Sequence, residues 1–413
     1  MRMWVYVIRR AVLVVPVVIG VMTVLFVLIS ALPVNERTCS YFRPSGRTSP
    51  CSPTISCPTD PSQTCANPVY NQAVQALGLN QPVPVQWAIY MSNALTFNWG
   101  YVSQGSALGT GLGGFGLPAL HGEPVVTVLG QFLPYTIELA LLSLLFILII
   151  AIPLGNLSAV YRNRPIDQAS RIMSFSGYAL PLFLLSTLAL ALAAFALGGP
   201  GAKSTACGGT STVFLDFYGS WPTPPCAPLY GTANLSPTLY PNWLQGGYIS
   251  TPTGFPTVDA AIHGQWALAG DTLIRIVLPA LTIAYGTIAI LLRFVRNSML
   301  EVMNLDYIRT ARAKGLPESR VIKKHAGRNS LNVTITVLGL TFAAFIAGFP
   351  VTETVFNLWG VGRIYAYSII GLPKDWDFAV IFGTTLLFTY MVVAANIIVD
   401  LLYAYLDPRV RLG

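Results

Sequence analysis

The hydrophobic positions of this 413-residue chain gather in six long runs that polar stretches separate. A helix needs about 20 predominantly apolar residues to cross a bilayer, and each run meets or approaches that length. The pattern therefore predicts an all-α membrane protein with six transmembrane helices rather than a series of soluble domains. The expected spans are residues 11–32, 132–159, 172–197, 273–294, 333–351 and 378–402.

Two details qualify these spans. Run 11–32 is longer than the 7–15-residue core of a secretory signal, so we interpret it as a retained anchor, although Ile29-Ser30-Ala31 resembles a weak cleavage site. Prolines are expected to kink the spans, although proline is also simply more frequent in membrane helices. These prolines are Pro153, Pro181, Pro279 and Pro350.

The basic residues predict how the helices are oriented. Only 10% of the residues are charged, which argues against an ordinary soluble enzyme. Lys and Arg concentrate in the cytoplasmic loops of membrane proteins. With the N-terminus inside, 17 of the 24 Lys and Arg fall in cytoplasmic segments. Both termini are therefore expected in the cytoplasm of a multi-pass protein of the cell membrane, and topology explains the positive charge without nucleic-acid binding.

This orientation divides the chain into five segments. Residues 1–32 are the N-terminal tail and first helix, and residues 33–129 form an extracytoplasmic loop that contains cysteines. Residues 130–197 hold helices two and three, and residues 198–270 form an extracytoplasmic loop rich in Pro and Gly. Residues 271–413 hold helices four to six, with a long inner loop at about 299–329.

All of the cysteines fall in the two loops that this orientation places outside. An even number of cysteines on the oxidising side is typical of disulfides, whereas a metal site is disfavoured by the absence of a CxxC pair and of a nearby His. We expect one bridge in the second loop and two in the first, where three connectivities are possible. Together the loops would form a stapled cap that docks an external partner, or a shell that only protects the helix ends. The cysteines are Cys39, Cys51, Cys57 and Cys65 in the first loop, and Cys207 and Cys226 in the second.

The inner segment after the fourth run has the pattern of two short helices. Asp306 or Asn304 is suited to cap the first helix, and Gly315 is suited to end it in a left-handed conformation. Pro317 is suited to the first turn of the second helix. The spacing therefore predicts a helical hairpin on the cytoplasmic side.

This hairpin has the composition of a docking surface. Ala311 and Ala313 are small enough to let another surface approach the backbone, and Arg309, Arg312 and Lys314 would give that surface a charge to match. The alternative is a solvated basic loop that only enforces topology.

At these residues the sequence resembles the cytoplasmic EAA loop of ABC importer permeases. DYIRTARAKGL, starting at Asp306, is followed by a basic helix and HAGRNSL, and the match is best to the first of the two permease subunits in the dipeptide/oligopeptide branch. Arg309-Thr310-Ala311 occupies the Glu-Ala-Ala positions, as is common in this branch. Further agreeing segments are residues 1–32, 76–87 (ALGLNQPVPVQW), 134–145 (PYTIELALLSLL), 152–168 (IPLGNLSAVYRNRPIDQ), 277–284 (VLPALTIA), 351–363 (VTETVFNLWGVGR) and 399–411 (VDLLYAYLDPRVR).

The sequence departs from the family at a few places. Residues 33–68 and much of 103–122 and 200–262 look like insertions. Trp359-Gly360 stands where the family usually has Pro-Gly. These departures concern the substrate and the outer loops and leave the inner hairpin untouched.

The resemblance implies a type I ABC importer fold and a translocation path that opens alternately to either side. It implies dipeptides or oligopeptides as substrates, with oligosaccharides as the alternative. Its implied partners are a second homologous permease subunit, one or two ATP-binding subunits, an extracytoplasmic substrate-binding protein and the lipid bilayer. The chain contains no G-x-x-x-x-G-K-[ST], so ATP and Mg²⁺ are expected in the partner subunits, and this chain is expected to be a transport subunit with no catalytic residue, cofactor or metal of its own. The implied ATPase-coupling residues are Asp306, Tyr307, Arg309, Ala311, Arg312, Ala313, Lys314 and Gly315, of which Tyr307, Ala311, Ala313 and Gly315 would contact or shape the docking joint.

Acidic residues near the spans are candidates for a gate or path. Ionisable residues within a membrane are functional candidates by default, whereas residues at helix ends only meet the headgroups. The candidates are Glu138, Glu353 and Asp400, the last with Arg293 as a possible partner.

Three other classes of protein remain as alternatives. An ion-coupled secondary transporter would often show internal repeats and central charges, and the sequence shows neither clearly. A membrane-embedded enzyme is disfavoured because His121, His263 and His325 are too scattered for a zinc site or a catalytic triad. A structural anchor would not need a sharply punctuated inner helix pair.

Overall fold

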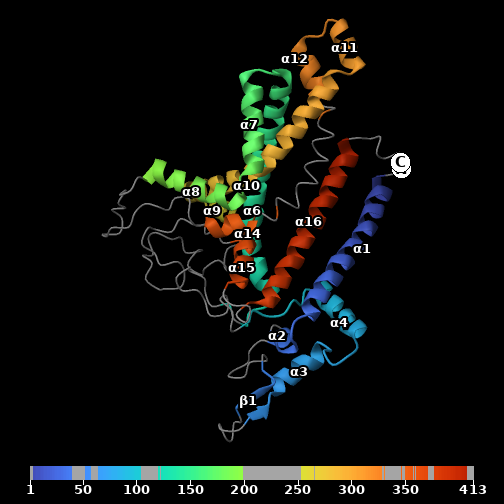
Figure 1. The fold of residues 1–413 in the computed structure, drawn as a ribbon, viewed down its shortest axis with the longest axis vertical. Helices are drawn as coiled ribbons and strands as arrows, with labels where there is room; N and C mark the ends of the chain where they lie inside the picture. The colour runs from blue at the N-terminus through green and yellow to red at the C-terminus, as the bar shows by residue number, and fades with distance from the viewer. Residues whose placement is uncertain are drawn as a thin grey trace.

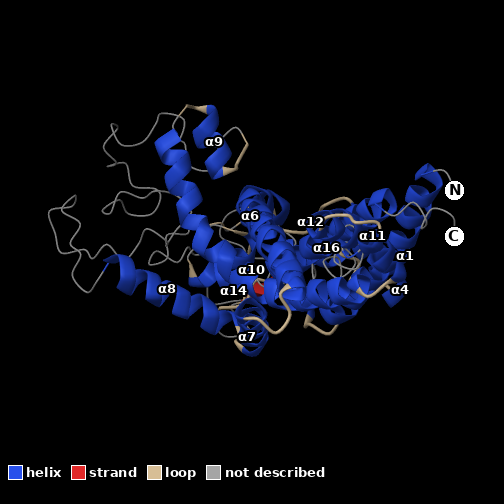
Figure 2. Cartoon of the chain, turned by 90° about the horizontal axis from the view of Figure 1, so that it is seen from above, coloured by secondary structure: helices blue, strands red, loops and turns tan. Residues whose placement is uncertain are grey.

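In the residues that it describes, the computed structural model is almost entirely helical (Figures 1 and 2). Its strands, within the described part, are β1 (Thr54–Ser56) and β2 (Thr64–Ala66), which pair antiparallel. The structure describes residues 3–39, 52–56, 64–103, 120, 122–198, 253–264, 266–327, 330, 346, 349–356, 358, 360–370 and 376–406. The helices outside the inner hairpin are α1 (Met3–Ser30), α2 (Val34–Cys39), α3 (Pro68–Ala76), α4 (Val83–Leu95), α6 (Val125–Val160), α7 (Pro165–Ala179), α8 (Leu182–Gly198), α9 (Pro256–Ile262), α10 (Trp266–Met303), α14 (Phe349–Val355), α15 (Val361–Ser368) and α16 (Phe378–Leu406).

Long apolar helices confirm a membrane protein built mainly from helices. In the described part, α6, α10 and α16 each contain a stretch that is long and apolar enough to cross a bilayer. They cover the second, fourth and sixth predicted spans, and α1 covers the first with a shorter apolar stretch. Most of the fifth run lies outside the described residues. The count of six spans therefore stays a prediction.

The third predicted span is a broken helix. Helices α7 and α8 meet at an angle of 113°. Leu180, between them, has an extended backbone with φ −87° and ψ 122°, which is the conformation that a following proline favours. Pro181 also lacks the N–H that would continue the helix. The predicted kink at Pro181 is therefore a sharp break, whereas Pro153 and Pro279 lie within the continuous helices α6 and α10.

Helices α6 and α10 pack against each other, and α7, α8, α9, α14, α15 and α16 each contact one or both of them. One apolar cluster joins α6 and α10 to α14, with Leu139, Ile283 and Phe349 among its buried residues. A second joins α6 to α15 and α16, and a third joins α1 to α4 and α16. In Figure 1, α7 runs beside α6 and α10, while α1 and α16 lie next to each other. Burial of these clusters fixes the long helices relative to one another.

The two ends of the long helices carry different segments (Figure 1). The turn between α6 and α7 and the segment after α10 lie at one end, and the start of α1 and the last turns of α16 point toward that same end. Helices α2, α3 and α4 and the strands lie at the opposite end. The segments that the charge pattern assigns to the cytoplasm thus share one end, whereas Cys65 in β2 lies at the other.

Candidate functional site

The segment after α10 folds as a short helical hairpin at one tip of the molecule (Figure 1). It consists of α11 (Asp306–Ala313), α12 (Glu318–Arg320) and the π-helical turn η4 (Val321–Ala326). Gly315 ends α11 with φ +73°, and its N–H donates to the carbonyl oxygen of Arg312 at 2.9 Å. Glycine is favoured in this left-handed region because it has no Cβ. The structure therefore shows the predicted helix pair and the predicted left-handed stop.

The predicted caps of the hairpin are wrong in detail. Leu305, with φ −74° and ψ 150°, occupies the N-cap of α11 and makes no side-chain cap. The Asn304 side chain instead donates to the carbonyl oxygen of Leu300 at 3.0 Å, because it still belongs to the end of α10. Asp306 is the first residue of α11. At this position its negative charge interacts favourably with the positive end of the helix dipole. Pro317 is the N-cap of α12 and precedes its first turn.

A small apolar core fixes the hairpin to the long helices. Ile308 and Val321 are fully buried, and they pack with Met299 of α10 and Ala159 of α6. Ala311 belongs to this core and is 7% exposed. The structure thus places Ala311 inside the hairpin core rather than on its exposed face, and its predicted part in contacting or shaping a docking joint stays a prediction. Ala311 shapes the hairpin from within.

The remaining predicted coupling residues form the exposed face of the hairpin. The side chains of Asp306 and Arg309 are 96% and 71% exposed and lie 3.5 Å apart. Ala313 and Lys314 are also exposed. Tyr307 is partly exposed, and its hydroxyl donates to the carbonyl oxygen of His325 at 3.4 Å, which links α11 to η4. The face is thus predominantly cationic, and Leu305 and Tyr307, which are 45% and 38% exposed, add some apolar surface to it.

An ion pair spans the turn between α11 and α12. Arg312 donates to both carboxylate oxygens of Glu318, at 2.7 Å and 3.1 Å. This hydrogen bonding lowers the pKa of Glu318 and raises the pKa of Arg312. Both side chains are about half exposed, so solvent screening limits such a pair to about 0–1 kcal/mol. Arg312 therefore closes the turn, while Lys314 and Arg309, whose pair with Asp306 is long and exposed, remain accessible from solvent.

The structure adds a buried carboxylate that the sequence analysis missed. Asp167, in the first turn of α7, is fully buried. It accepts hydrogen bonds from Arg296 Nε of α10 at 2.7 Å, from Ser158 Oγ of α6 at 2.8 Å, from the Asn163 N–H at 2.8 Å and from Arg171 at 2.9 Å. One side chain thus ties together α6, α7 and α10 near the end that carries the hairpin. The only hint in the sequence is that Asp167 follows Pro165 in the segment PIDQ. An Asp in the first turn is typical of any helix, so this position does not indicate a buried carboxylate.

Two of the three candidate gate residues come together. Glu353 is 1% exposed and accepts from Thr136 Oγ1 of α6 at 2.8 Å and from the Arg363 N–H of α15 at 3.0 Å. Glu138 and Glu353 line the same small cavity, of about 10 Å³, between α6, α9 and α10. Asp400 lies in α16, and its side chain is outside the described part. Whether these residues gate a path stays a prediction.

Gly360 explains how the Glu353 carboxylate fits against the turn before α15. A Cβ at Gly360 would overlap the Glu353 carboxylate. Thr136 Oγ1 also accepts the Val361 N–H at 2.9 Å. A side chain at position 360 would therefore push α15 away from α6, so this glycine matters although Trp359 replaces the family's usual proline.

The predicted disulfides fall largely outside the described residues. Cys65 in β2, opposite Ile55, has a bonded sulfur rather than a free thiol. The side chains of Cys39, Cys51, Cys57, Cys207 and Cys226 lie outside the described part. No complete disulfide can be described there, and the predicted pairs stay predictions.

Comparison with known proteins agrees with this arrangement. Residues 151–412 match the family of binding-protein-dependent transport system inner membrane components. The chain is 35% identical over 361 residues to the probable D,D-dipeptide transport system permease protein DdpB of Escherichia coli (strain K12), which covers 86% of this chain and 90% of that protein. It is 30% identical over 414 residues to the dipeptide transport system permease protein DppB of Alkalihalophilus pseudofirmus, covering 98% and 99% of the two chains. It is 29% identical over 407 residues, with the same coverage, to the oligopeptide transport system permease protein AppB of Bacillus subtilis (strain 168).

These matches define a membrane transport component of the binding-protein-dependent class. The chain belongs to this family, as an ABC importer permease of its dipeptide/oligopeptide branch. The family membership that the sequence of the inner hairpin and its flanking segments indicated is thereby confirmed.

Proposed function

We propose that this chain forms part of the translocation path of an ATP-driven importer for dipeptides or oligopeptides. We propose further that the hairpin of α11, α12 and η4 docks into a separate ATP-hydrolysing subunit. The observation that carries the proposal is the hairpin itself, which presents an exposed cationic face while its buried face is anchored on α10 and α6. A loop that served only to set topology would need no apolar core of its own.

The anchoring supports a mechanical role for α10. This helix has 38 residues, so at 1.5 Å per residue it is about 57 Å long and reaches from the hairpin through the thickness of a bilayer. Ile308 and Val321 pack on its last turns. A displacement of the hairpin by the closing ATPase would therefore be transmitted along α10 to the membrane part of the path.

Asp167 extends this connection to the neighbouring helices. Its pairing with Arg296 links α7 to α10, and its bond to Ser158 links α7 to α6. We propose that the three helices move as one body when the hairpin moves. Glu353 would then hold α15 on α6 at the other side of the bundle, where it borders the path together with Glu138.

The proposed partners follow from the family. They are a second homologous permease subunit, one or two ATP-binding subunits that supply ATP and Mg²⁺, and an extracytoplasmic substrate-binding protein. The hairpin and both termini would face the cytoplasm, as the distribution of Lys and Arg indicates, and the cysteine-containing loops would form a disulfide-stapled cap outside. Peptides are the proposed substrates because the relatives are peptide permeases.

The substrate class is tested with the complete transporter complex. The chain is purified with its co-expressed partner subunits and reconstituted in proteoliposomes with the binding protein, and ATP hydrolysis is measured with dipeptides, oligopeptides and oligosaccharides. The proposal predicts stimulation by peptides. Stimulation by oligosaccharides alone would show that the substrates are oligosaccharides rather than peptides. The proposed coupling mechanism would be unaffected by that result.

The energy source is tested separately. Uptake into proteoliposomes is measured after ATP depletion while the ion gradient is held constant. The proposal predicts that uptake stops. Continued uptake would identify an ion-coupled secondary transporter and would contradict the proposed role of the hairpin.

A further inference from the structure

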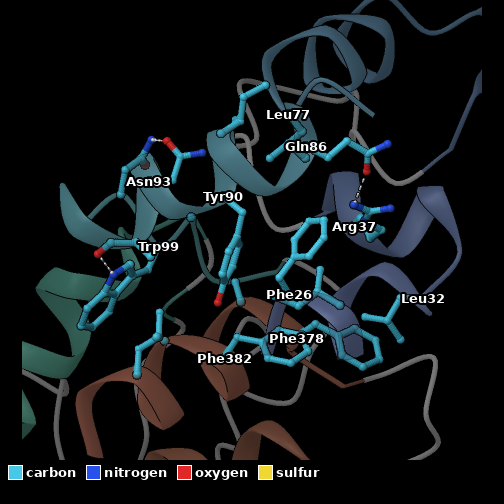
Figure 3. A pocket seen from close by; sticks show the side chains of 18 of the residues that line it. Phe26, Leu32, Arg37, Leu77, Gln86, Tyr90, Asn93, Trp99, Phe378 and Phe382 are labelled. Atoms are coloured by element: carbon cyan, nitrogen blue, oxygen red, sulfur yellow. Dashed lines mark hydrogen bonds between the residues drawn. The ribbon is translucent and has the colours of Figure 1, made fainter. Parts of the chain in front are cut away.

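A second feature lies at the end of the molecule opposite the hairpin. A cavity of about 120 Å³ opens between α1, α2, α4 and α16 (Figure 3). Its wall is largely apolar and includes several aromatic side chains, and Arg37 of α2 and Gln86 of α4 stand at one side of it. The aromatic residues of the wall are Phe26, Tyr90, Trp99, Phe378 and Phe382.

The cavity lies where the hydrocarbon of a bilayer would meet the headgroups. It is bounded by the last turns of α1, which ends at Ser30, and by the first turns of α16, which begins at Phe378. Val27 on α1 is 58% exposed and so faces the surroundings of the helix. Trp87 of α4 also lies here and donates to Thr23 Oγ1 of α1 at 3.1 Å. Trp and Tyr are enriched at this level of membrane proteins, so the position of the cavity fits the boundary between hydrocarbon and headgroups.

Two polar groups of the cavity are incompletely paired. Arg37 is half-buried and donates to Gln86 Oε1 at 2.9 Å, but within the described part no carboxylate lies within ion-pair distance of it. This holds even for Glu36, which also lines the cavity. Burial lowers the pKa of Arg37, which is the sign of an incompletely compensated cation. The hydroxyl of Tyr90 is buried without a hydrogen-bond partner in this part of the chain, and its ring points from α4 toward α16 (Figure 3).

We propose that this cavity binds a phospholipid, with an acyl chain against the apolar wall and the phosphate at Arg37. A phosphate accepts several charge-assisted hydrogen bonds from a guanidinium. Val27 and Leu28 of α1, next to the lining residues Phe26 and Ile29, are exposed, and an acyl chain would enter from that side. The bound lipid joins α1 and α4 to α16, helices that otherwise meet through a limited apolar cluster.

Lipid retention by the purified full-length chain tests the proposal. The chain is reconstituted in nanodiscs that contain equal amounts of phosphatidylglycerol, phosphatidylethanolamine and diacylglycerol, is then released into mild detergent, and is analysed by native mass spectrometry. The expected result is one retained phospholipid per chain, with diacylglycerol retained about tenfold less. Loss of hydrogen bonds to a charged group explains a factor of this size.

Three variants separate this site from general lipid binding. Arg37→Gln should lower phospholipid retention about tenfold, because it removes the cation but keeps hydrogen-bonding capacity. Leu79→Trp, which fills part of the cavity wall, should lower retention of any lipid. Arg162→Gln changes an exposed arginine at the opposite end of the helices and should leave retention unchanged. Thermal unfolding of each variant in the same detergent shows whether it is folded.

The outcomes are distinct. Retention of diacylglycerol as strong as that of the phospholipids would overturn the role of the phosphate. Unchanged phospholipid retention in folded Arg37→Gln would overturn the site itself. Displacement of the retained lipid by millimolar dipeptide would overturn the lipid as occupant and would identify a substrate pocket, since Glu36 and Arg37 together could pair with both ends of a peptide.

Discussion

Replacement of Gly315 by valine is the sharpest perturbation of the hairpin. Gly315 has φ +73° at the turn between α11 and α12. A Cβ built there meets no atom within 4 Å, so valine would create no clash with a neighbour. The whole effect of Gly315→Val therefore comes from the backbone conformation.

The size of this effect follows from the backbone and from what opposes it. A left-handed conformation costs a residue with a side chain about 1–2 kcal/mol, and a β-branched residue is among the least suited to it. The Arg312–Glu318 pair is exposed and offsets at most about 1 kcal/mol. The buried contacts of Ile308 keep α11 on α10, so the strain is expected to displace the turn while the helices stay folded. A shift of 1–2 kcal/mol lowers the population of the productive turn by a factor of about 5 to 30.

The assay is the amount of peptide taken up per ATP hydrolysed in proteoliposomes that contain the complete complex. Gly315→Val should lower this ratio at least about fivefold, while membrane insertion and complex assembly stay normal. Gly315→Asn should keep most of the coupling, because asparagine tolerates the left-handed region. Gly264→Val is the matched control, since Gly264 has φ +71° and equally open surroundings but lies after α9, away from the hairpin. Normal coupling in the Gly315→Val complex, or an equal loss in Gly264→Val, would refute the reasoning.

Three further predictions concern the anchoring of the hairpin. Asp167→Asn breaks a buried ion pair and should destabilise the purified chain by about 3–5 kcal/mol in thermal unfolding, whereas Asp306→Asn, at a side chain that is 96% exposed, should change little; equal effects would contradict the buried network. Ile308→Ala should cost the hairpin about 2–5 kcal/mol and make it sensitive to limited proteolysis, and unchanged proteolysis would argue against its core. Since Arg312 lowers the pKa of Glu318, the pair's stabilisation of up to about 1 kcal/mol is present above pH 4.5, the ordinary pKa, and is lost as the pH falls through the lowered pKa. Proteolysis of the hairpin should therefore accelerate slightly upon acidification, and Glu318→Gln should abolish that change; an identical pH dependence in the variant would show that another group is responsible.

Local rules predicted part of this structure well. The long apolar runs identify α1, α6, α10 and α16 because a spanning helix must satisfy its backbone internally and face lipid with apolar side chains. Gly315 could be placed because a left-handed helix end favours glycine whatever lies around it. Pro181 could be expected to disturb its helix, since proline removes a backbone donor. The 113° angle at that break depends on how the two helices pack, so it could not be predicted from the residues near Pro181.

The remainder depends on contacts between distant parts of the chain. Asp167 pairs with Arg296, 129 positions further on, and nothing near Asp167 distinguishes it from an ordinary residue at a helix start. Ala311 and Ala313 look alike in the sequence, yet Ala311 is buried in the hairpin core whereas Ala313 is exposed. Glu353 was recognised as a candidate, but its neighbour Thr136 on α6 became visible only in the folded chain.

Site-specific photocrosslinking tests the central claim most directly. A benzoylphenylalanine is placed in the full-length chain at Ala313, on the exposed face of α11, and in a second variant at Leu95, which is 60% exposed at the opposite end. After irradiation of intact membranes, crosslinked proteins are identified by mass spectrometry. The account predicts that position 313 links to an ATP-binding subunit and that position 95 does not. A crosslink from position 313 to the extracytoplasmic binding protein, or an ATP-binding subunit captured only from position 95, would contradict it.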